Sequence, residues 1–112
     1  MYKRGGIYHV EMGPGSAAET EVCPCLVVSN NISNEFSPVV TVIPLSFSNL
    51  ERIYDFETLL PAVKTGLAQD AKISSHLLFT IEKTKVVSDR LGFLSKRLMV
   101  QVDRALRFQL GL

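Results

Sequence analysis

The sequence predicts a single mainly β domain over residues 1–112, in which a small, strongly bent antiparallel sheet or barrel carries one C-terminal helix. Short apolar runs, separated by clusters of Gly, Pro, Ser and Asn, fill residues 6–87 and are typical of many short strands. Only the last segment has apolar residues at helical spacing. The length of 112 residues allows one core without a second independent unit.

The first half of the chain predicts two strands and a long loop. Residues 6–12 alternate as a first strand, and the glycine, proline, small and acidic residues at 13–21 predict a loop. We expect this loop to be mobile, because nothing in it can pack. A buried strand at 25–29 is entered through Pro24, and the Asn and Ser residues at 30–34 predict a turn after it.

The middle of the chain predicts further short strands. The β-branched run at 39–43 predicts a central strand that Pro44 ends. Apolar and charged residues alternate at 52–59, as in an exposed edge strand. The segments 76–81 and 83–87 predict two short strands or one bent strand.

The last segment predicts an amphipathic helix over residues 95–110. Ser95 is a suitable N-cap and Gly111 a suitable stop, and the apolar stripe should close one end of the sheet. Val100 and Phe108 fall outside that stripe. Apolar side chains on a face that should be polar predict a two-fold homodimer.

Composition excludes some classes of function. The net charge of +1 gives no overall basicity for nucleic-acid binding. The charge is uneven, however, with nine basic and four acidic residues at 58–112 against three basic and seven acidic residues at 1–57. The second half could attract an anionic ligand, or it could simply present solvated faces. The sequence has no apolar run of membrane-spanning length and no secretory leader, so we expect a cytoplasmic protein without a membrane partner.

The two cysteines, Cys23 and Cys25, stand two apart on a predicted strand. We place their side chains on opposite faces, which argues against a disulfide between them. Two thiols without a further ligand pair do not make a metal site, so we expect no metal and no cofactor. Reduced cysteines agree with a cytoplasmic location.

Several segments, taken in order along nearly the whole chain, resemble the MazF/PemK family of toxins from type II toxin–antitoxin systems. They are Lys3-Arg4-Gly5-Gly6-Ile7-Tyr8, Pro24-Cys25-Leu26-Val27-Val28-Ser29-Asn30, Ser37-Pro38-Val39-Val40-Thr41-Val42-Ile43-Pro44-Leu45-Ser46, Gly66-Leu67-Ala68-Gln69-Asp70, Thr80-Ile81-Glu82-Lys83, Leu91-Gly92-Phe93-Leu94-Ser95 and the closing helix from Val102 to Leu112.

The resemblance implies a fold, partners and an activity. The fold is an SH3-like antiparallel β-barrel, shared with the gyrase poison CcdB. The partners are a second copy, a cognate antitoxin, single-stranded RNA and, only through the antitoxin complex, operator DNA. The activity is metal-free cleavage of single-stranded mRNA, in which the 2′-OH of the RNA attacks and leaves a cyclic phosphate. Such chemistry needs a base, an acid and donors for the phosphorane charge.

The resemblance also places candidate catalytic residues at Cys23, Ser46 and His76. Cys23 stands where the family has an arginine, and a thiol cannot bind a phosphate bidentately. Ser46 stands where the family has a threonine and keeps the hydroxyl. His76 lies where the family has an Asp-Gln-x-Arg segment and could act as a base near neutral pH. Each has a structural alternative: a buried small hydrophobe, a turn residue and a polar surface residue, respectively.

Candidate RNA contacts are Glu19, Pro24 and Phe47. Glu19 is one step from the position at which the family has an acid. Tyr8, Phe36 and Phe47 could stack on bases, although a core role is the better reading for at least two of them. His9, in mid-strand, is read as structural.

Three hypotheses for the function follow. The chain is a MazF-type toxin that cleaves RNA weakly or with rearranged groups, a catalytically inactive relative that binds antitoxin, RNA or operator DNA in a complex, or a CcdB-like gyrase poison. The missing arginine disfavours the first, and the MazF-like strand and helix segments disfavour the third.

Overall fold

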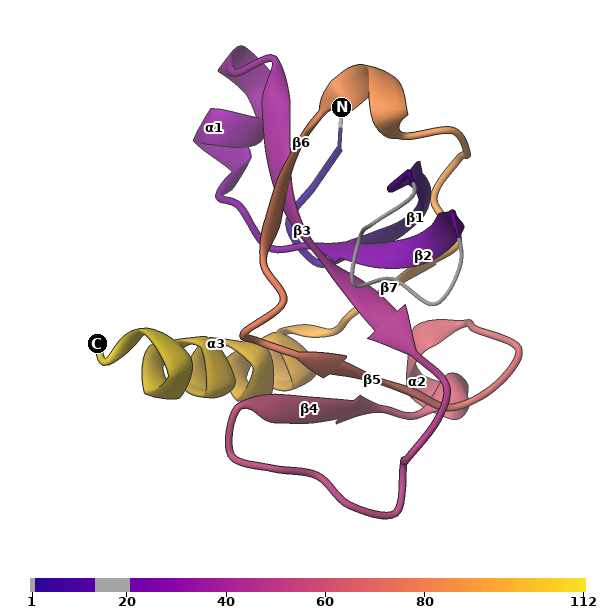
Figure 1. Ribbon diagram of the computed structural model, residues 1–112, viewed down its shortest axis with the longest axis vertical. Coiled ribbons are helices and arrows are strands. Elements are labelled where there is room, and N and C mark those ends of the chain that lie inside the picture. The colour runs from indigo at the N-terminus through magenta and orange to yellow at the C-terminus, as the bar shows by residue number, and fades with distance from the viewer. Residues whose placement is uncertain (1, 14–20) are drawn as a thin grey trace.

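The fold of the chain, seen in a computed structural model that describes residues 2–13 and 21–112, is a curled antiparallel sheet with a helix against it (Figure 1). This confirms the predicted fold class. The elements, in chain order, are β1 (Gly6–Glu11), β2 (Val22–Val27), α1 (Asn31–Phe36), β3 (Val39–Ser46), β4 (Glu57–Leu60), α2 (Ala62–Thr65), β5 (Ala71–Ser74), β6 (Phe79–Glu82), a 3-10 turn (Lys83–Lys85), β7 (Gly92–Phe93) and α3 (Lys96–Leu110).

Strand β3 organises the sheet, because it pairs with β2, β5 and β6. The strand order is β4-β5-β3-β2-β1-β7, with β6 paired to β3 off this path. The prediction that Pro44 ends β3 is wrong, since the strand continues to Ser46 and turns there onto β5. Proline lacks an N–H donor, and Pro24 and Pro44 stand where β2 and β3 part.

The two faces of the curled sheet bury two separate cores. The first core lies between the sheet and α3, which is visible beside β4 and β5 in Figure 1. Its fully buried members are Ile7, Leu26, Ile43, Leu60, Ala71, Ile73, Leu94 and Val102. The second core lies inside the curl of β1, β2, β3 and β6, and is formed by Tyr8, Val10, Cys23, Cys25, Val27, Val40 and Val42.

Helix α3 has the predicted bounds and caps. The Ser95 hydroxyl accepts from the backbone N–H of Leu98, and Gly111 ends the helix in the left-handed region at φ 71°. Val100 and Phe108 are 54% and 59% exposed, so they do lie outside the buried stripe. The Arg4 side chain fastens the helix to the sheet, donating to the Val28 carbonyl and to the Asp103 carboxylate.

Several predicted strands and turns are wrong in detail. The predicted turn at 30–34 is the start of α1, because the Asn30 side chain caps it by accepting from the Ser33 N–H. Of the predicted edge strand at 52–59, only the end forms a strand, as part of β4 (Glu57–Leu60). The segment 83–87 is not a strand, since its first three residues form the 3-10 turn.

Two other predictions concern the long loop and the membrane. Residues 14–20 of the predicted mobile loop lie outside the described residues. At its base, the N–H groups of Met12 and Gly13 both donate to the Glu21 carbonyl, at 2.7 and 3.3 Å. No helix in the described part of the chain is long and apolar enough to cross a membrane.

Candidate functional site

Two of the predicted catalytic positions, Cys23 and Ser46, each lie two residues beyond the last paired residues of β2 and β3. The hydrogen-bonded register runs from Val27↔Val42 to Cys25↔Pro44 and stops there. Continued by two residues, the same register sets Cys23 against Ser46. The resemblance implies that these two positions belong to one site.

Cys23 and Cys25 point to the same face of β2, so the prediction that they point to opposite faces is wrong. Side chains two apart on a strand share a face, and here both lie in the second core with their Sγ atoms 3.6 Å apart. Both are free thiols, 3% and 0% exposed. Their contact with each other, and burial, raise the pKa of the Cys25 thiol far above its usual range. Buried, neutral thiols are poor nucleophiles.

Ser46 ends β3 with a half-buried side chain. Its hydroxyl lies 3.4 Å from the Ser48 hydroxyl and 3.4 Å from the Ser48 N–H, which donates to it. In the ladder with β5, Ser46 pairs with Lys72. Cross-strand partners share a face, so the lysine is the charged residue next to this position.

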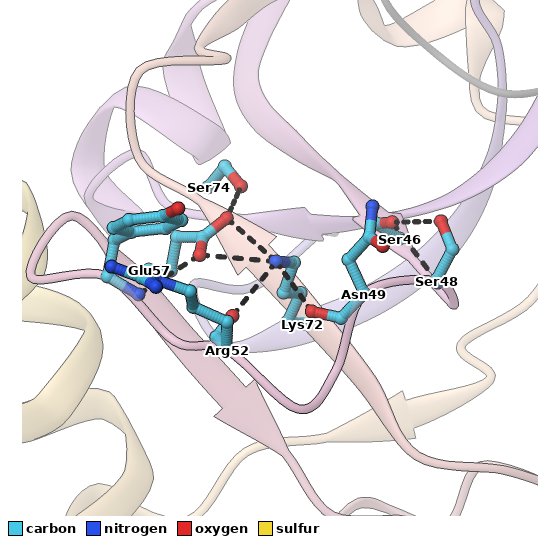
Figure 2. A network of polar contacts seen from close by, with 8 residues as sticks. Ser46, Ser48, Asn49, Arg52, Glu57, Lys72 and Ser74 are labelled. Atoms are coloured by element: carbon cyan, nitrogen blue, oxygen red, sulfur yellow. Dashed lines mark hydrogen bonds and ion pairs between the residues drawn. The ribbon is translucent and has the colours of Figure 1, made fainter.

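Lys72 forms a buried network that the sequence analysis missed (Figure 2). Its Nζ donates to the carbonyls of Asn49 and Arg52, at 2.9 and 3.2 Å, and to the Glu57 carboxylate, at 3.2 Å. The side chains of Lys72 and Glu57 are only 8% and 6% exposed. An ammonium group has three N–H donors, and these three acceptors use all of them. Lys72 therefore holds the 47–56 segment to β5 and has no donor left for a phosphate.

Glu57 is the acceptor at the centre of this network. Burial alone would raise the pKa of its carboxyl group. The Ser74 hydroxyl at 2.6 Å, the Tyr54 N–H at 3.1 Å and the Lys72 ammonium outweigh burial, and the net effect lowers the pKa of Glu57 below its ordinary value. A lysine between two buried apolar residues, Ala71 and Ile73, was the signal in the sequence that could have revealed the network.

The structure does not bring His76 to the site. His76 lies in the turn after β5, not in a strand as predicted, and its exposed ring sits edge-on to Phe56 with centroids 4.8 Å apart. It lies two residues beyond the end of β5, where the Leu77 N–H donates to the Ser74 carbonyl and turns the chain. The surface reading of His76 is thus the one the structure supports.

The predicted RNA contacts Pro24 and Phe47 line one cavity on the other face of the sheet. The cavity holds about 290 Å³ and is lined by His9, Pro24, Phe47, Gly66, Leu67, Ala68, Gln69 and Leu91. Pro24 and His9 are cross-strand partners, which explains why both line it. The lining is largely apolar, with one imidazole and one amide. Glu19 lies outside the described residues.

Of the three aromatic residues that could stack on bases, two have core positions. Tyr8 is 6% exposed inside the second core, and Phe47 packs against the first. Phe36, on α1, is 79% exposed. The expectation that at least two serve the core is confirmed.

Comparison with known families and proteins agrees with this architecture. Residues 3–110 match the model of the PemK-like, MazF-like toxins of type II toxin–antitoxin systems. The chain is 32% identical over 118 aligned residues to endoribonuclease MazF9 of Mycobacterium tuberculosis, covering 100% of this chain and 98% of that protein. It is 30% identical to endoribonuclease EndoA of Bacillus subtilis, covering 100% of this chain and 97% of EndoA.

Solved structures show the same fold. A mycobacterial endoribonuclease in complex with its cognate antitoxin superposes with a TM-score of 0.80 at 24% identity, over 100% of this chain and 97% of that one. MazF from Deinococcus radiodurans superposes with a TM-score of 0.78 at 19% identity, over 99% of this chain and 97% of that one.

Proposed function

The chain belongs to the PemK-like, MazF-like toxins of type II toxin–antitoxin systems, and we propose that it pairs with a cognate antitoxin and binds single-stranded RNA but cleaves it only weakly. The observation that carries this proposal is Cys23. It occupies the position at which the resemblance expects an arginine, and it is 3% exposed inside the second core.

We expect weak cleavage because the site lacks a cation or free donors for the charge of the phosphorane. Attack by a 2′-OH builds negative charge on the phosphorane, and preorganised donors or cations are usually the largest source of its stabilisation. A buried neutral thiol supplies neither. Lys72, the charged residue beside Ser46, has its three donors already engaged. The Ser46 hydroxyl is the polar group that the site retains from the family pattern.

Binding is better supported than turnover. The cavity with Pro24, Phe47 and His9 offers an apolar surface and a hydrogen-bonding ring, which suits an unstacked base.

Val100 and Phe108 expose an apolar strip on α3, which supports a homodimer as the commonest closed assembly. Antitoxin complexes are known among the similar folds, and operator DNA would be reached only through such a complex. We place the pair in the cytoplasm. The match to MazF-type relatives favours RNA over gyrase as the target.

Cys23→Arg is the substitution that tests this proposal. It introduces a cation at the position where the resemblance expects the arginine. Removing one such donor elsewhere costs roughly 10²–10³ in rate, so the variant should recover part of that factor. Recovery should be partial, because the resemblance aligns the Asp-Gln-x-Arg segment of the family with residues 76–79 and so puts Phe79 at its arginine, a second missing cation. The measurement is metal-free cleavage of a long single-stranded RNA, with cyclic-phosphate ends scored.

Two variants and one control make the result specific. Cys23→Ala changes the same position without adding a cation and should gain nothing, and adding Ser46→Ala to Cys23→Arg should remove the gain. Sedimentation of each variant checks the assembly, and a monomer at micromolar concentration would contradict the homodimer. Vigorous cleavage by the unmodified chain, unchanged in Cys23→Ala and Cys23→Arg, would place the active site elsewhere.

A further inference from the structure

We propose that Cys23, Cys25 and Met12 form a binding site for one soft monovalent metal ion, Cu(I) or Ag(I). The proposal goes beyond the toxin function and does not depend on it. It starts from three sulfur atoms that β1 and β2 bring to one face of the sheet. The sequence analysis counted only two ligands, because no further ligand pair follows the two cysteines in the sequence.

The spacing of the sulfur atoms suits a small coordination site. The two thiol sulfurs are 3.6 Å apart, and the thioether sulfur of Met12 is 4.0 Å from the Sγ of Cys25. Metal–sulfur bonds are about 2.3 Å long, so three sulfurs around one trigonal ion stand about 4 Å apart. Both recorded separations come within a few tenths of an ångström of that value, which small rotamer adjustments can supply.

The register explains why the methionine is there. Val10 pairs with Cys23, and Met12 is two residues further along the same face of the chain. The N–H of Met12 donates to the Glu21 carbonyl, which continues the β1–β2 ladder past β1. The backbone pairing therefore fixes Met12 on the face that carries the cysteines, and its long side chain reaches along the strand to Cys25.

The chemistry of the donor set selects the class of metal. Thiolate and thioether ligands are soft and select Cu(I), whereas carboxylate and carbonyl oxygens suit Mg²⁺ and Ca²⁺. The surroundings are apolar, with Val10 and Val27 in the same core. Within the described residues no group of three His, Cys, Asp or Glu side chains could hold an ion, so no harder site competes.

Metal binding must also release the thiol protons and give the ion a route to the sulfurs. Each coordinating thiol releases its proton to solvent as its bond to the metal forms, so two thiolates and one monovalent cation leave a single negative charge. Cys23 and Cys25 are almost fully buried, whereas Met12 is half-buried. The ion would therefore enter past the thioether.

The test is a titration of the reduced protein under anaerobic conditions, after mass spectrometry has shown both thiols free. Cu(I) is supplied from a chromophoric chelator, and Ag(I) is run in parallel because it does not change oxidation state. We expect one ion per chain, a thiolate-to-copper absorption band and an all-sulfur first shell by X-ray absorption. Zn(II) at the same concentration should not displace Cu(I).

Three variants separate the site from general thiol reactivity. Cys23→Ala removes a ligand and should weaken retention by more than the roughly 100-fold that losing an outer-shell partner can cost. Met12→Leu keeps the apolar volume and should weaken it by roughly 10-fold or more. Met99→Leu is the matched control, since Met99 packs on the first core, and it should change nothing. Circular dichroism checks that each variant folds.

Some outcomes would overturn the proposal. They are complete loss of copper to the chelator, a stoichiometry of one ion shared by two chains, tighter binding of Zn(II) than of Cu(I), or equal retention in the unmodified chain and Met12→Leu. RNA cleavage is not read in these experiments, so their failure would leave the proposed function as it stands.

Discussion

The pair Lys72–Glu57, on β5 and β4, and the pair Cys23–Cys25, on β2, are both buried, but they are held in place in different ways. The first pair is charged, and its members also engage two carbonyls, a backbone N–H and the Ser74 hydroxyl. The second pair consists of thiols, with sulfur–sulfur contacts between the two cysteines and from Cys25 to Met12 in apolar surroundings. A buried charge is stable only when hydrogen-bond and ion-pair partners offset its desolvation. A buried thiol behaves as a small apolar side chain and depends mainly on packing.

Breaking the charged pair should therefore have the largest effect on stability. Lys72→Met leaves the Glu57 carboxylate buried without its cation, and we expect a loss of about 3–5 kcal/mol in the free energy of unfolding. Urea unfolding at pH 7 measures it. The double variant Lys72→Met with Glu57→Leu should recover most of the loss, because no charge remains buried. A loss of no more than about 1 kcal/mol, the range of an exposed pair, would contradict this.

Protonating Glu57 tests the same pair by a smaller change, because Lys72 and its carbonyl partners stay in place. The folded-state pKa of Glu57 is lowered, so its contribution is complete above the unfolded value of about 4.3 and is lost as pH falls through the folded value. Unfolding free energy measured from pH 7 downward should fall in that window. The difference in unfolding free energy between the unmodified chain and Glu57→Gln should shrink as pH falls. A constant difference would show that Glu57 does not drive the pH dependence.

Truncating a thiol of the thiol pair should have the smallest effect on the free energy of unfolding. Cys25→Ala leaves no unpaired charge and removes only one sulfur atom from the second core. We expect a loss of about 1–2 kcal/mol in the metal-free protein, by thermal or urea unfolding. A loss equal to that of Lys72→Met would show that the thiol pair is more than packing in the absence of metal.

The sequence predicted the features that depend on local pattern. The β-branched run of β3, the helical spacing of α3 and the caps Ser95 and Gly111 act within a few residues, and the structure confirms them. The course of β3 beyond Pro44 could not be predicted in this way, because it is decided by β5, whose four residues give too weak a pattern of their own.

In the candidate site, too, some features could be predicted from the sequence and others depend on distant segments of the chain. The resemblance set Cys23 against Ser46, and the paired register of β2 and β3 ends two residues before both of them. The network around Lys72 depends on carbonyls of a loop some twenty residues earlier in the chain, which no local pattern records. The placement of the cysteines is a different matter, since period-two alternation already puts Cys23 and Cys25 on one face, and our prediction misapplied it.

The two separate cores also differ in how much of the chain each one needs. All members of the second core, and the side chains packed on it, lie between Tyr2 and Val86. The first core runs from Ile7 to Val102 and includes Leu98 and Val102 from α3. The curl of β1, β2, β3 and β6 can therefore bury its interior without any residue of α3, whereas the first core is complete only when that helix packs.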